Sequence, residues 1–294
     1  MLDLQKEPGK REPISIGIDI GGTNTRLGLF HSLDTPHFTT LAKFPTSQHY
    51  EQQLQSIMTA IQSKGLTHLA GIGVSIAGRI AKDGRSVVVA PNLPEYIARP
   101  FAQQLSEQFG CPTRLAHDAV CGLLAEKKFG FIQHSDRCAY LTVSTGTGAA
   151  IQLAKAAHAL TSSIEIGHQI LAGNQRICLC GQVGCLETFT GGRQIALRYG
   201  RSAIEITDTS FWEDFCTKLA LGLVNLAMLT RIDVVAVSGA IILNNRHLLA
   251  RIQQHVNAVI RDSTLELGVA QAGEDAPIIG AALLLSVPEE TILH

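Results

Sequence analysis

The 294-residue chain has no strong net charge and no long apolar run, and both absences exclude classes of function. Its formal net charge is −1 at pH 7, so no overall basic field favours nucleic acid or an anionic membrane as a partner. The longest apolar stretch, residues 276–287, is shorter than the about 20 residues that a membrane-spanning helix needs. Residues 1–13 lack the apolar core of a signal peptide and predict a flexible tail on a cytoplasmic protein.

Cysteines are few and unevenly placed, which argues against a disulfide framework. The chain has seven of them, an odd number, and three fall together at Cys178, Cys180 and Cys185. In a reducing compartment such a cluster indicates a metal site before it indicates disulfides.

The chain does have the composition and the periodicity of a folded α/β protein. Hydrophobic residues make up 46% and charged residues 17%, which favours a globular fold, and the length favours two domains. Apolar runs of strand length alternate with segments of helical periodicity, the pattern of an α/β fold. The expected helices are residues 50–63, 97–109, 119–130, 211–230 and 245–262, with a last buried helix in IIGAALLLS. The expected strands include 14–20, 25–30, 113–118 and 233–239, and a hairpin that joins 69–78 to 86–94 through a turn at 82–84.

One pattern occurs twice, and the repeat predicts two related lobes. A strand, a turn rich in glycine and threonine, and a second strand form residues 14–30, and the same order returns in residues 139–153. We expect a small lobe of residues 14–117, on which a C-terminal helix at 281–294 packs, and a large lobe of residues 118–280.

Glycine-rich turns can bind anions through their backbone. Without a Cβ, N–H groups come within hydrogen-bonding range of a phosphate, and threonine hydroxyls add donors. Neither turn is a dinucleotide fingerprint or a P-loop, because both of those motifs need a helix directly after the turn. Two such turns predict a polyphosphate held between the lobes, with ordinary hairpin turns as the alternative. Asp19, at the end of the first strand, could hold the Mg²⁺ of a nucleotide triphosphate or could stabilise the turn.

Asp118 lies between an expected strand and an expected helix, where two roles are open. Aspartate is a favoured helix N-cap, worth about 1 kcal/mol. As a general base it could instead take the proton of an attacking hydroxyl, which commonly gives about 10²–10⁴-fold in rate. Asn caps helices about as well but cannot accept that proton, so Asp118→Asn separates the two interpretations.

Four metal-binding side chains fall within one short segment. GHQILAGNQRICLCGQVGC supplies one imidazole and three thiolates, the donor set of a closed tetrahedral zinc site. We expect a structural Zn²⁺ with no open position for water, and the alternative is buried cysteines that pack as small hydrophobes. Gly181 and Gly184 would let the chain fold tightly around the ion. The expected ligands are His168, Cys178, Cys180 and Cys185.

Two glutamates flank these ligands. Glu165 lies three residues before His168, and Glu187 lies two residues after Cys185. A metal that pins both loops would bring the carboxylates together, where they could accept hydrogen bonds from the hydroxyls of a sugar. A solvated surface position is the alternative for each glutamate alone.

Together these motifs resemble those of the ROK family (repressor, open reading frame, kinase), which includes bacterial sugar kinases. The resemblance covers residues 14–285, and its zinc segment is the most specific part. The matching motifs are DIGGT at 19–23, PNL at 91–93, HDA at 117–119, STGTG at 144–148, EIGH at 165–168, the segment 178–187 and IGAALL at 279–284.

The resemblance implies a two-lobed, actin-like ATPase fold of the ribonuclease H type, whose duplicated domains close on ATP and a hexose. It also implies a homodimer and makes Asp118 the catalytic base. The residues that would cradle the phosphates with Mg²⁺ are Gly21, Gly22, Thr23, Thr145, Gly146 and Thr147, with Gly239 near the adenosine. The residues that would surround the sugar are Asn92, His117, Glu165, His168 and Glu187.

At four places the chain departs from the residues that are usual in this family. His117 stands where the family usually has an asparagine that contacts the sugar, and a bulkier, titratable ring there could change which hexose fits. Ala149 and Ala150 replace glycines of the second phosphate turn. Ser238 replaces one of the paired glycines near the adenosine, and Ile164 replaces the glycine before Glu165.

The expected function is ATP-dependent phosphorylation of a hexose or N-acetylhexosamine at its 6-hydroxyl. Kinases for glucose, N-acetylmannosamine, N-acetylglucosamine, allose and fructose share this framework. A DNA-binding repressor is a second hypothesis, but the residues before the first strand are too few for a helix-turn-helix domain. A sugar-sensing protein that binds without turnover is the third.

Overall fold

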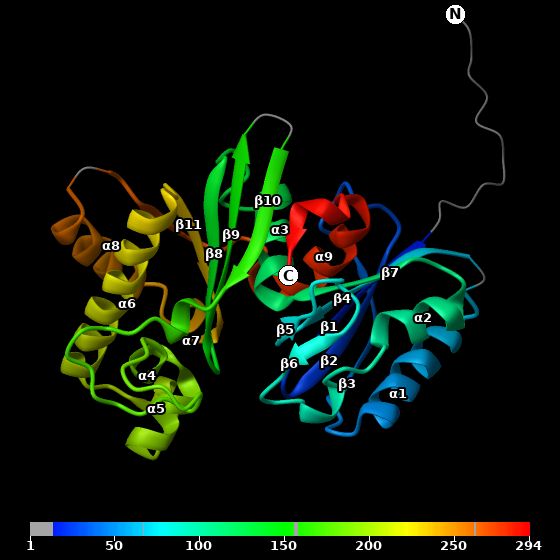
Figure 1. Cartoon of the computed structure of the whole chain (residues 1–294), viewed down its shortest axis with the longest axis horizontal. Coiled ribbons are helices and arrows are strands. Elements are labelled where there is room, and N and C mark those ends of the chain that lie inside the picture. The colour runs from blue at the N-terminus through cyan, green and yellow to red at the C-terminus, as the bar shows by residue number, and fades with distance from the viewer. Residues whose placement is uncertain (1–13, 67, 156–157, 262) are drawn as a thin grey trace, which may run out of the picture.

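The computed structural model describes residues 14–66, 68–155, 158–261 and 263–294. They form two α/β lobes that lie side by side, with two helices between them (Figure 1). The predicted tail, residues 1–13, lies outside the described residues. Within the described ranges, no helix combines the length and the apolar character that crossing a lipid bilayer requires.

The first lobe is built on a five-stranded sheet with the order β3-β2-β1-β4-β7. β1 and β3 both pair antiparallel with β2, whereas β4 runs parallel to β1 and β7 parallel to β4. The strands are β1 (Ile14–Ile20), β2 (Asn24–Phe30), β3 (Thr39–Pro45), β4 (Leu69–Ile76) and β7 (Thr113–His117).

The second sheet repeats this topology. Its order is β12-β11-β8-β9-β10-β13, with β8, β9 and β10 antiparallel and β11 and β12 parallel to β8. β8 therefore corresponds to β1 and β9 to β2, so the repeat in the sequence is a repeat in topology. The strands are β8 (Arg137–Val143), β9 (Thr147–Lys155), β10 (His158–Ile164), β11 (Val234–Ser238), β12 (Glu266–Val269) and the short β13 (Ile292–Leu293), which runs parallel to β10.

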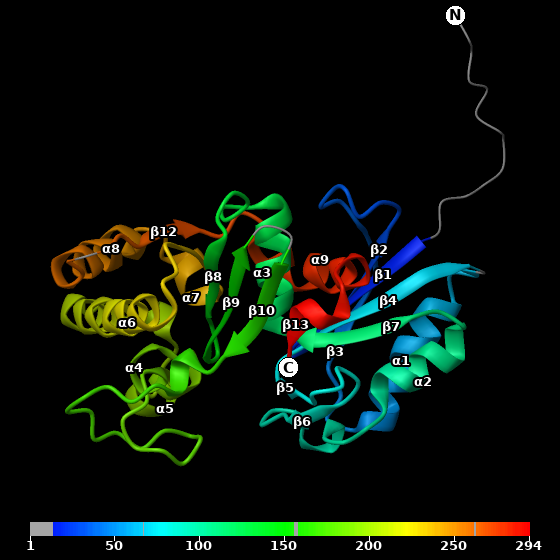
Figure 2. The same cartoon turned by 45° about the horizontal axis from the view of Figure 1, so that its top comes forward.

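Each sheet has helices on both faces. α1 (Tyr50–Gln62) and α2 (Phe101–Phe109) cover the outer face of the first sheet, and α6 (Thr209–Thr230) and α8 (Leu248–Val259) cover the outer face of the second. α3 (Asp118–Phe129) and α9 (Ala276–Leu283) pack against each other between the two sheets (Figure 2). The remaining short helices are α4 (Glu187–Thr190), α5 (Gly192–Tyr199) and α7 (Ala240–Asn244).

The alternation of side chains along β1 decides what each face of the first sheet can hold. Ile18 and its apolar neighbours point into the cluster under α1 and α2. The opposite face carries glycines, and a Cβ on Gly73 would lie 1.7 Å from the carbonyl oxygen of Ala281, so only glycine lets α9 come this close. Farther along the same face of β1, beyond Gly17, stands Asp19.

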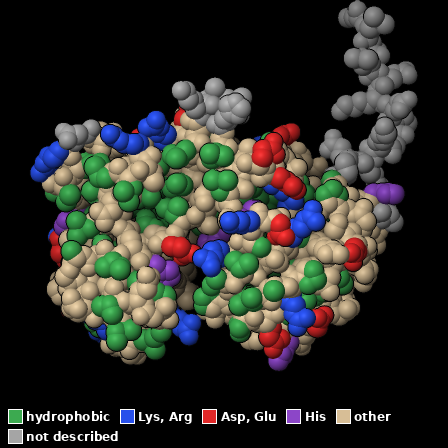
Figure 3. Space-filling view, in the orientation of Figure 1, with side chains coloured by type: hydrophobic (Ala, Val, Ile, Leu, Met, Phe, Trp, Pro, Cys, Tyr) green, Lys and Arg blue, Asp and Glu red, His purple; other side chains and the backbone are tan. Residues whose placement is uncertain are grey.

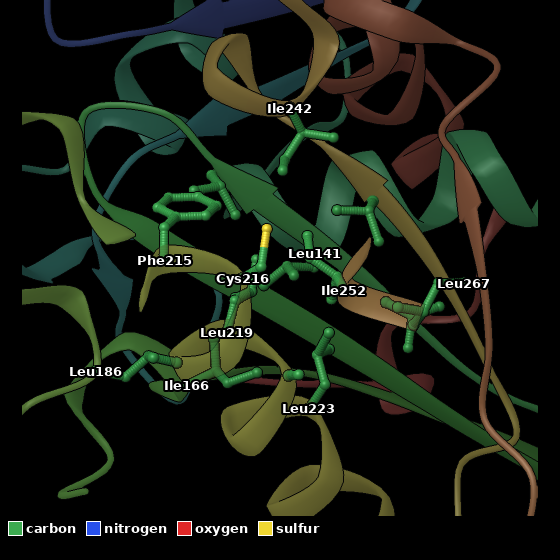
Figure 4. Close-up of a cluster of buried hydrophobic side chains, with 14 of the residues drawn as sticks. Leu141, Ile166, Leu186, Phe215, Cys216, Leu219, Leu223, Ile242, Ile252 and Leu267 are labelled. Carbon is green, nitrogen blue, oxygen red and sulfur yellow. The ribbon is translucent and has the colours of Figure 1, made fainter. Parts of the chain in front are cut away.

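The core of the second lobe is a large cluster of buried apolar side chains. Leu219 and Leu223 of α6 are fully buried against Leu141 of β8 and Ile252 of α8, with Cys216 among them (Figure 4). Ile166 and Leu186, which flank the expected zinc ligands, belong to the same cluster. The metal-binding segment is therefore anchored in the core at both of its ends.

Two expected helices have different boundaries, for local reasons. The helix expected at 97–109 begins at Phe101, because Ala98 adopts a φ of +59° and Pro100 precedes the first turn. The helix expected at 245–262 is the shorter α8, which begins at Leu248 and ends at Val259, and a separate short helix that was not expected, α7, precedes it. α7 ends where the side chains of Asn244 and Asn245 donate to the carbonyls of Ala240 and Ile241.

The expected hairpin and the C-terminal helix also differ. Residues 69–76 form β4 in the main sheet, and the hairpin pairs only β5 (Arg79–Ile80) with β6 (Val87–Val89). The expected helix at 281–294 is wrong: α9 ends at Leu283, and β13 follows two 3₁₀ turns. α9 also contacts both β1 and α3, so it packs between the lobes.

Candidate active site

The two glycine–threonine turns occupy equivalent positions at the ends of β1 and β8. The first comprises residues 21–24 and the second residues 144–146, between the last paired residues of their strands. Charged side chains of both signs and histidines gather along the junction of the lobes (Figure 3).

The first turn is open to solvent and is held from one side. The Thr46 hydroxyl donates to the Gly21 carbonyl at 2.7 Å, and the Thr46 amide donates to the Thr23 carbonyl at 2.9 Å. Gly22 and Thr23 are exposed. An open pocket of about 290 Å³ lies here, lined by the turn with Asp19, Arg26, Lys43 and Glu274.

Asp19, the expected magnesium residue, is part of an ion-pair chain. Its Oδ2 accepts from Arg26 at 2.9 Å and its Oδ1 from the Ser75 hydroxyl at 3.2 Å. Arg26 also pairs with Asp275, which directly precedes α9, at 2.8 Å. Burial raises the pKa of Asp19, although Arg26 and Ser75 favour its charged form, and the nearby charge of Asp118 raises it further.

The second turn is held from within the protein. Glu187 accepts a hydrogen bond from the Thr147 amide at 2.8 Å, and the hydroxyls of Thr147 and Thr190 lie 2.7 Å apart. The polar groups of Thr147 that were expected to cradle a phosphate therefore have protein partners. Thr145 is the exposed residue of this turn, and a Cβ on Gly146 would lie 2.8 Å from a Glu187 oxygen.

Gly239, expected near the adenosine, lies directly behind the second turn. It precedes α7 with a φ of +90°, and a Cβ there would lie 2.3 Å from the Val143 carbonyl oxygen. Only glycine fits both conditions. The strand that ends at Ser238 is thereby held against the strand that carries the second turn.

Asp118 is the first residue of α3, and His117 rather than Asp118 is the residue that caps the helix. The Ala119 amide donates to Asp118 Oδ1 at 2.7 Å and to His117 Nδ1 at 3.1 Å, and that Nδ1 lies 2.9 Å from Asp118 Oδ1. The His117 ring lies near the start of β9, the strand that follows the second turn, because a Cβ on Gly148 would lie 3.9 Å from its Cε1.

His117 and Asp118 each shift the pKa of the other. Burial by itself would raise the pKa of Asp118, but His117 and the Ala119 amide outweigh it and leave the pKa below its usual value. Burial would likewise lower the pKa of His117, but Asp118 and the charge of Glu165 raise it. Because the Asp118 side chain is 31% exposed, a ligand can reach it.

Asn92 is linked to the second turn through Arg193, a residue that the sequence analysis did not identify. A Cβ on Gly22 would lie 3.7 Å from the Asn92 side-chain nitrogen. On its other side, Asn92 Oδ1 accepts from Arg193 Nη1 at 3.3 Å, and the Arg193 amide donates to the Thr145 carbonyl at 2.9 Å. Contacts therefore run from the first turn to the second.

The predicted metal ligands form one cluster. The ligand atoms of His168, Cys178, Cys180 and Cys185 all lie within 4.8 Å of one another. Tetrahedral bonding with Zn–S distances of about 2.3 Å places two sulfurs about 3.8 Å apart. Cys180 and Cys185 have their sulfurs 3.7 Å apart, and Cys178 Sγ lies 3.8 Å from His168 Nδ1. The geometry is consistent with a zinc site.

The surroundings of the cluster support its ligands. Gly181 and Gly184 adopt φ values of +91° and +96°, which allows the tight fold between the cysteines. The Gln194 amide donates to Cys178 Sγ at 3.2 Å. His168 faces the cysteines with Nδ1 and places Nε2 4.0 Å from Glu165, which connects the metal cluster to a residue expected to bind sugar.

Comparison with known proteins decides the family. The model of the ROK family matches residues 15–287. The chain belongs to the ROK family. It has the actin-like fold of that family and is 21% identical to the solved ROK glucokinase of Streptomyces griseus in complex with glucose and AMPPNP. That likeness has a TM-score of 0.75 and covers 92% of this chain and 98% of the glucokinase.

Relatives in the family differ in what they do. A putative xylose repressor of Caldicellulosiruptor sp. is 28% identical over 203 residues, covering 66% of this ROK chain. The match spans only half of the length of that repressor. The N-acetylmannosamine kinase of Vibrio vulnificus (strain CMCP6) is 27% identical over 289 residues, covering 91% of this chain and 96% of the kinase.

Proposed function

We propose that this protein transfers the terminal phosphoryl group of ATP to the 6-hydroxyl of a hexose or N-acetylhexosamine. The observation that carries the proposal is the placement of Asp118. It starts a helix between the two sheets, its neighbour His117 lies near Gly148 in the strand that follows the second turn, and its charge acts on Asp19 beside the first turn. A base in that position serves a hydroxyl that attacks a phosphate held between the turns.

Asp118 would accept the proton of the sugar hydroxyl at its Oδ2. Its Oδ1 already accepts from the Ala119 amide, which fixes the plane of the carboxylate. The hydrogen bond from the Ala119 amide and the contact with His117 lower the pKa of Asp118. The carboxylate is therefore ionised at neutral pH and can accept a proton. Asn92, Glu165, His168 and Glu187 would orient the sugar, with Glu187 also holding the second turn through Thr147.

The phosphates would lie against Gly21, Gly22 and Thr23 in one lobe and against Thr145 and Gly146 in the other. Asp19 is the carboxylate that would hold the Mg²⁺ of the nucleotide, whose chemistry is to neutralise phosphate charge. Arg26 and Ser75 each bond one oxygen of Asp19, so a cation bound there would share the carboxylate with them and would be repelled by the Arg26 charge. Asp275 remains to pair with Arg26.

The metal cluster would have a structural role. Its four protein donors complete a tetrahedral Zn²⁺ site and leave no position for a reacting group. Held in this way, His168 presents Nε2 to Glu165 and orders the loop before Glu187. The zinc site would thus shape the sugar site without taking part in the reaction.

The test is ADP release with Mg-ATP across glucose, fructose, allose, N-acetylglucosamine and N-acetylmannosamine. We expect one sugar to release ADP in step with sugar phosphate. Asp118→Asn should then lower kcat by about 10²–10⁴-fold while sugar binding persists. Full activity of a folded Asp118→Asn protein would contradict the role of the base. Sugar binding without ADP release from the wild type would instead identify a sugar sensor. A repressor among the relatives supports this second function.

A further inference from the structure

Arg193 has its backbone fixed by the second turn. It is the second residue of α5, and its amide donates to the Thr145 carbonyl at 2.9 Å. The amide of Gly192 donates to the Ser144 carbonyl at 2.8 Å, so two successive bonds tie the start of the helix to the turn. Any shift of the turn therefore carries Arg193 with it.

The side chain of Arg193 reaches to the other lobe. Its Nη1 donates to Asn92 Oδ1 at 3.3 Å, and the Asn92 amide lies against Gly22 of the first turn. The guanidinium therefore lies between two turns that each present backbone to the same space. This is the space that the proposed function assigns to the phosphates.

The charge of Arg193 has only a neutral partner. Among the described residues, no carboxylate lies within 4.0 Å of its guanidinium, whereas Arg26, the other arginine beside the turns, pairs with Asp19 and Asp275. A single bond of 3.3 Å to an amide oxygen at an exposed site is weak and easily exchanged. A guanidinium binds phosphate oxygens with two parallel donors, which is a stronger contact.

We propose that Arg193 is a catalytic residue that binds the phosphoryl group during its transfer from ATP. This inference rests on the proposed kinase function. The negative charge that spreads over the phosphoryl oxygens in the transition state would draw Arg193 away from Asn92. Asn92 Oδ1 is then free to accept a hydrogen bond from the sugar, so nucleotide and sugar binding favour each other.

The matched pair for the test is Arg193→Gln and Arg198→Gln. Arg198 lies on the same helix, is exposed, and stacks on Tyr199 with 4.9 Å between its guanidinium carbon and the ring centre. Both variants remove one positive charge from α5, but only Arg193 faces the turns. Steady-state kinetics with the sugar found active would give kcat and the KM for ATP and for sugar.

We expect Arg193→Gln to lower kcat/KM for ATP by about 10²–10³-fold. Arg193→Lys should recover part of the loss, because it keeps the charge but not the paired donors. Arg198→Gln should stay within about twofold of the wild type. An Arg193→Gln enzyme within about threefold of the wild type, or an equal loss in both variants, overturns the inference.

A binding measurement separates failure of this inference from failure of the proposed function. If the wild type phosphorylates no sugar in the panel, the kinase proposal fails by itself. The affinity for Mg-AMPPNP, measured by calorimetry on the same folded proteins, still tests the phosphate contact. We expect binding about tenfold weaker in Arg193→Gln than in Arg198→Gln. Equal affinities would show that Arg193 does not bind the phosphates.

Discussion

The two lobes have the same strand order, but their turns are supported in opposite ways. The first turn, residues 21–24, is exposed and held by Thr46, next to the ion pairs of Asp19, Arg26 and Asp275. The second turn, residues 144–146, is next to a neutral strand end, where Thr142 stands in the place of Asp19. It is held by Glu187, by Thr190 and by the start of α5.

The difference shows how a duplicated framework can divide the work between its halves. A charged turn whose ion pairs can exchange partners is suited to a nucleotide and its metal. A turn held by buried hydrogen bonds and by a metal-binding segment is suited to positioning, because its groups cannot move far. The same topology therefore supports one adjustable side and one rigid side.

Removal of the metal should have the largest effect, and it should loosen the second lobe while leaving the first lobe unchanged. We expect Cys185→Ser, or treatment with a zinc chelator, to abolish catalysis and to lower Tm by about 10 °C, at roughly 2–4 °C per kcal/mol for a chain of this size. Hydrogen exchange should rise in peptides of residues 144–200 and stay unchanged around residues 21–24. Mass spectrometry of both the exchange and the zinc content checks this.

The control is a cysteine of the first lobe. Cys111→Ala removes a buried thiol far along the chain from the cluster and should leave one zinc per chain and the exchange of the second turn unchanged. If chelation loosens both turns equally, the metal does not support one side alone, and the contrast between the lobes is lost.

The hydrogen bonds that support the two turns should differ in how much each contributes to the free energy of unfolding. Glu187→Ala leaves the Thr147 amide without its acceptor, which costs about 1–3 kcal/mol, and should lower kcat/KM at least about tenfold. Thr46→Ala removes a hydroxyl bond at an exposed turn and should cost about 0.5–1.5 kcal/mol. Denaturant unfolding and steady-state kinetics on the two variants give the comparison.

Glu187→Gln serves as the reference, because glutamine keeps an oxygen that can accept from Thr147. It should recover most of the stability lost in Glu187→Ala. A larger loss of stability in Thr46→Ala than in Glu187→Ala would reverse the assignment of the rigid side.

Much of the candidate site could be proposed from the sequence because its signals are local. The ligands of the metal cluster all fall in one segment between His168 and Cys185, and a soft donor set in one short segment has few other uses. The turns and Asp118 stand at the ends of apolar strands, where topology brings residues to one edge. The fold class followed from the alternation of elements and from the repeat.

What could not be predicted depends on contacts between distant segments. Arg193 contacts Asn92 in the other lobe, and Glu187 contacts the Thr147 amide, and no periodicity reports either pairing. His117 was expected only at the sugar, and its Nδ1 lies beside both the Ala119 amide, from which it accepts when unprotonated, and Asp118 Oδ1, with which it pairs when protonated. The helix boundaries were missed where side chains of Asn244 and Asn245 compete for the backbone.

The smallest expected effect concerns pH and the His117–Asp118 pair beside the second turn. The raised pKa of His117 means that its stabilisation is fully present below about pH 6.5 and is lost as pH rises through the folded-state pKa. The lowered pKa of Asp118 means that its contribution is lost only as pH falls below its folded-state pKa, under about 3.8. Glu165 also faces the ring and adds to the shift.

We therefore expect the free energy of unfolding of the wild type to exceed that of His117→Asn between these limits, by about 1 kcal/mol for a partly exposed pair. The difference should shrink above pH 6.5 as His117 loses its proton. Chemical denaturation of both proteins from pH 4 to pH 9 measures it. In an Asp118→Asn background the pH dependence of the difference should become smaller, because the carboxylate that contributes most to holding the proton on His117 is gone and Glu165 remains. A difference that stays constant across this range, or whose pH dependence is undiminished in that background, would show that His117 packs beside Asp118 without charge interaction between them.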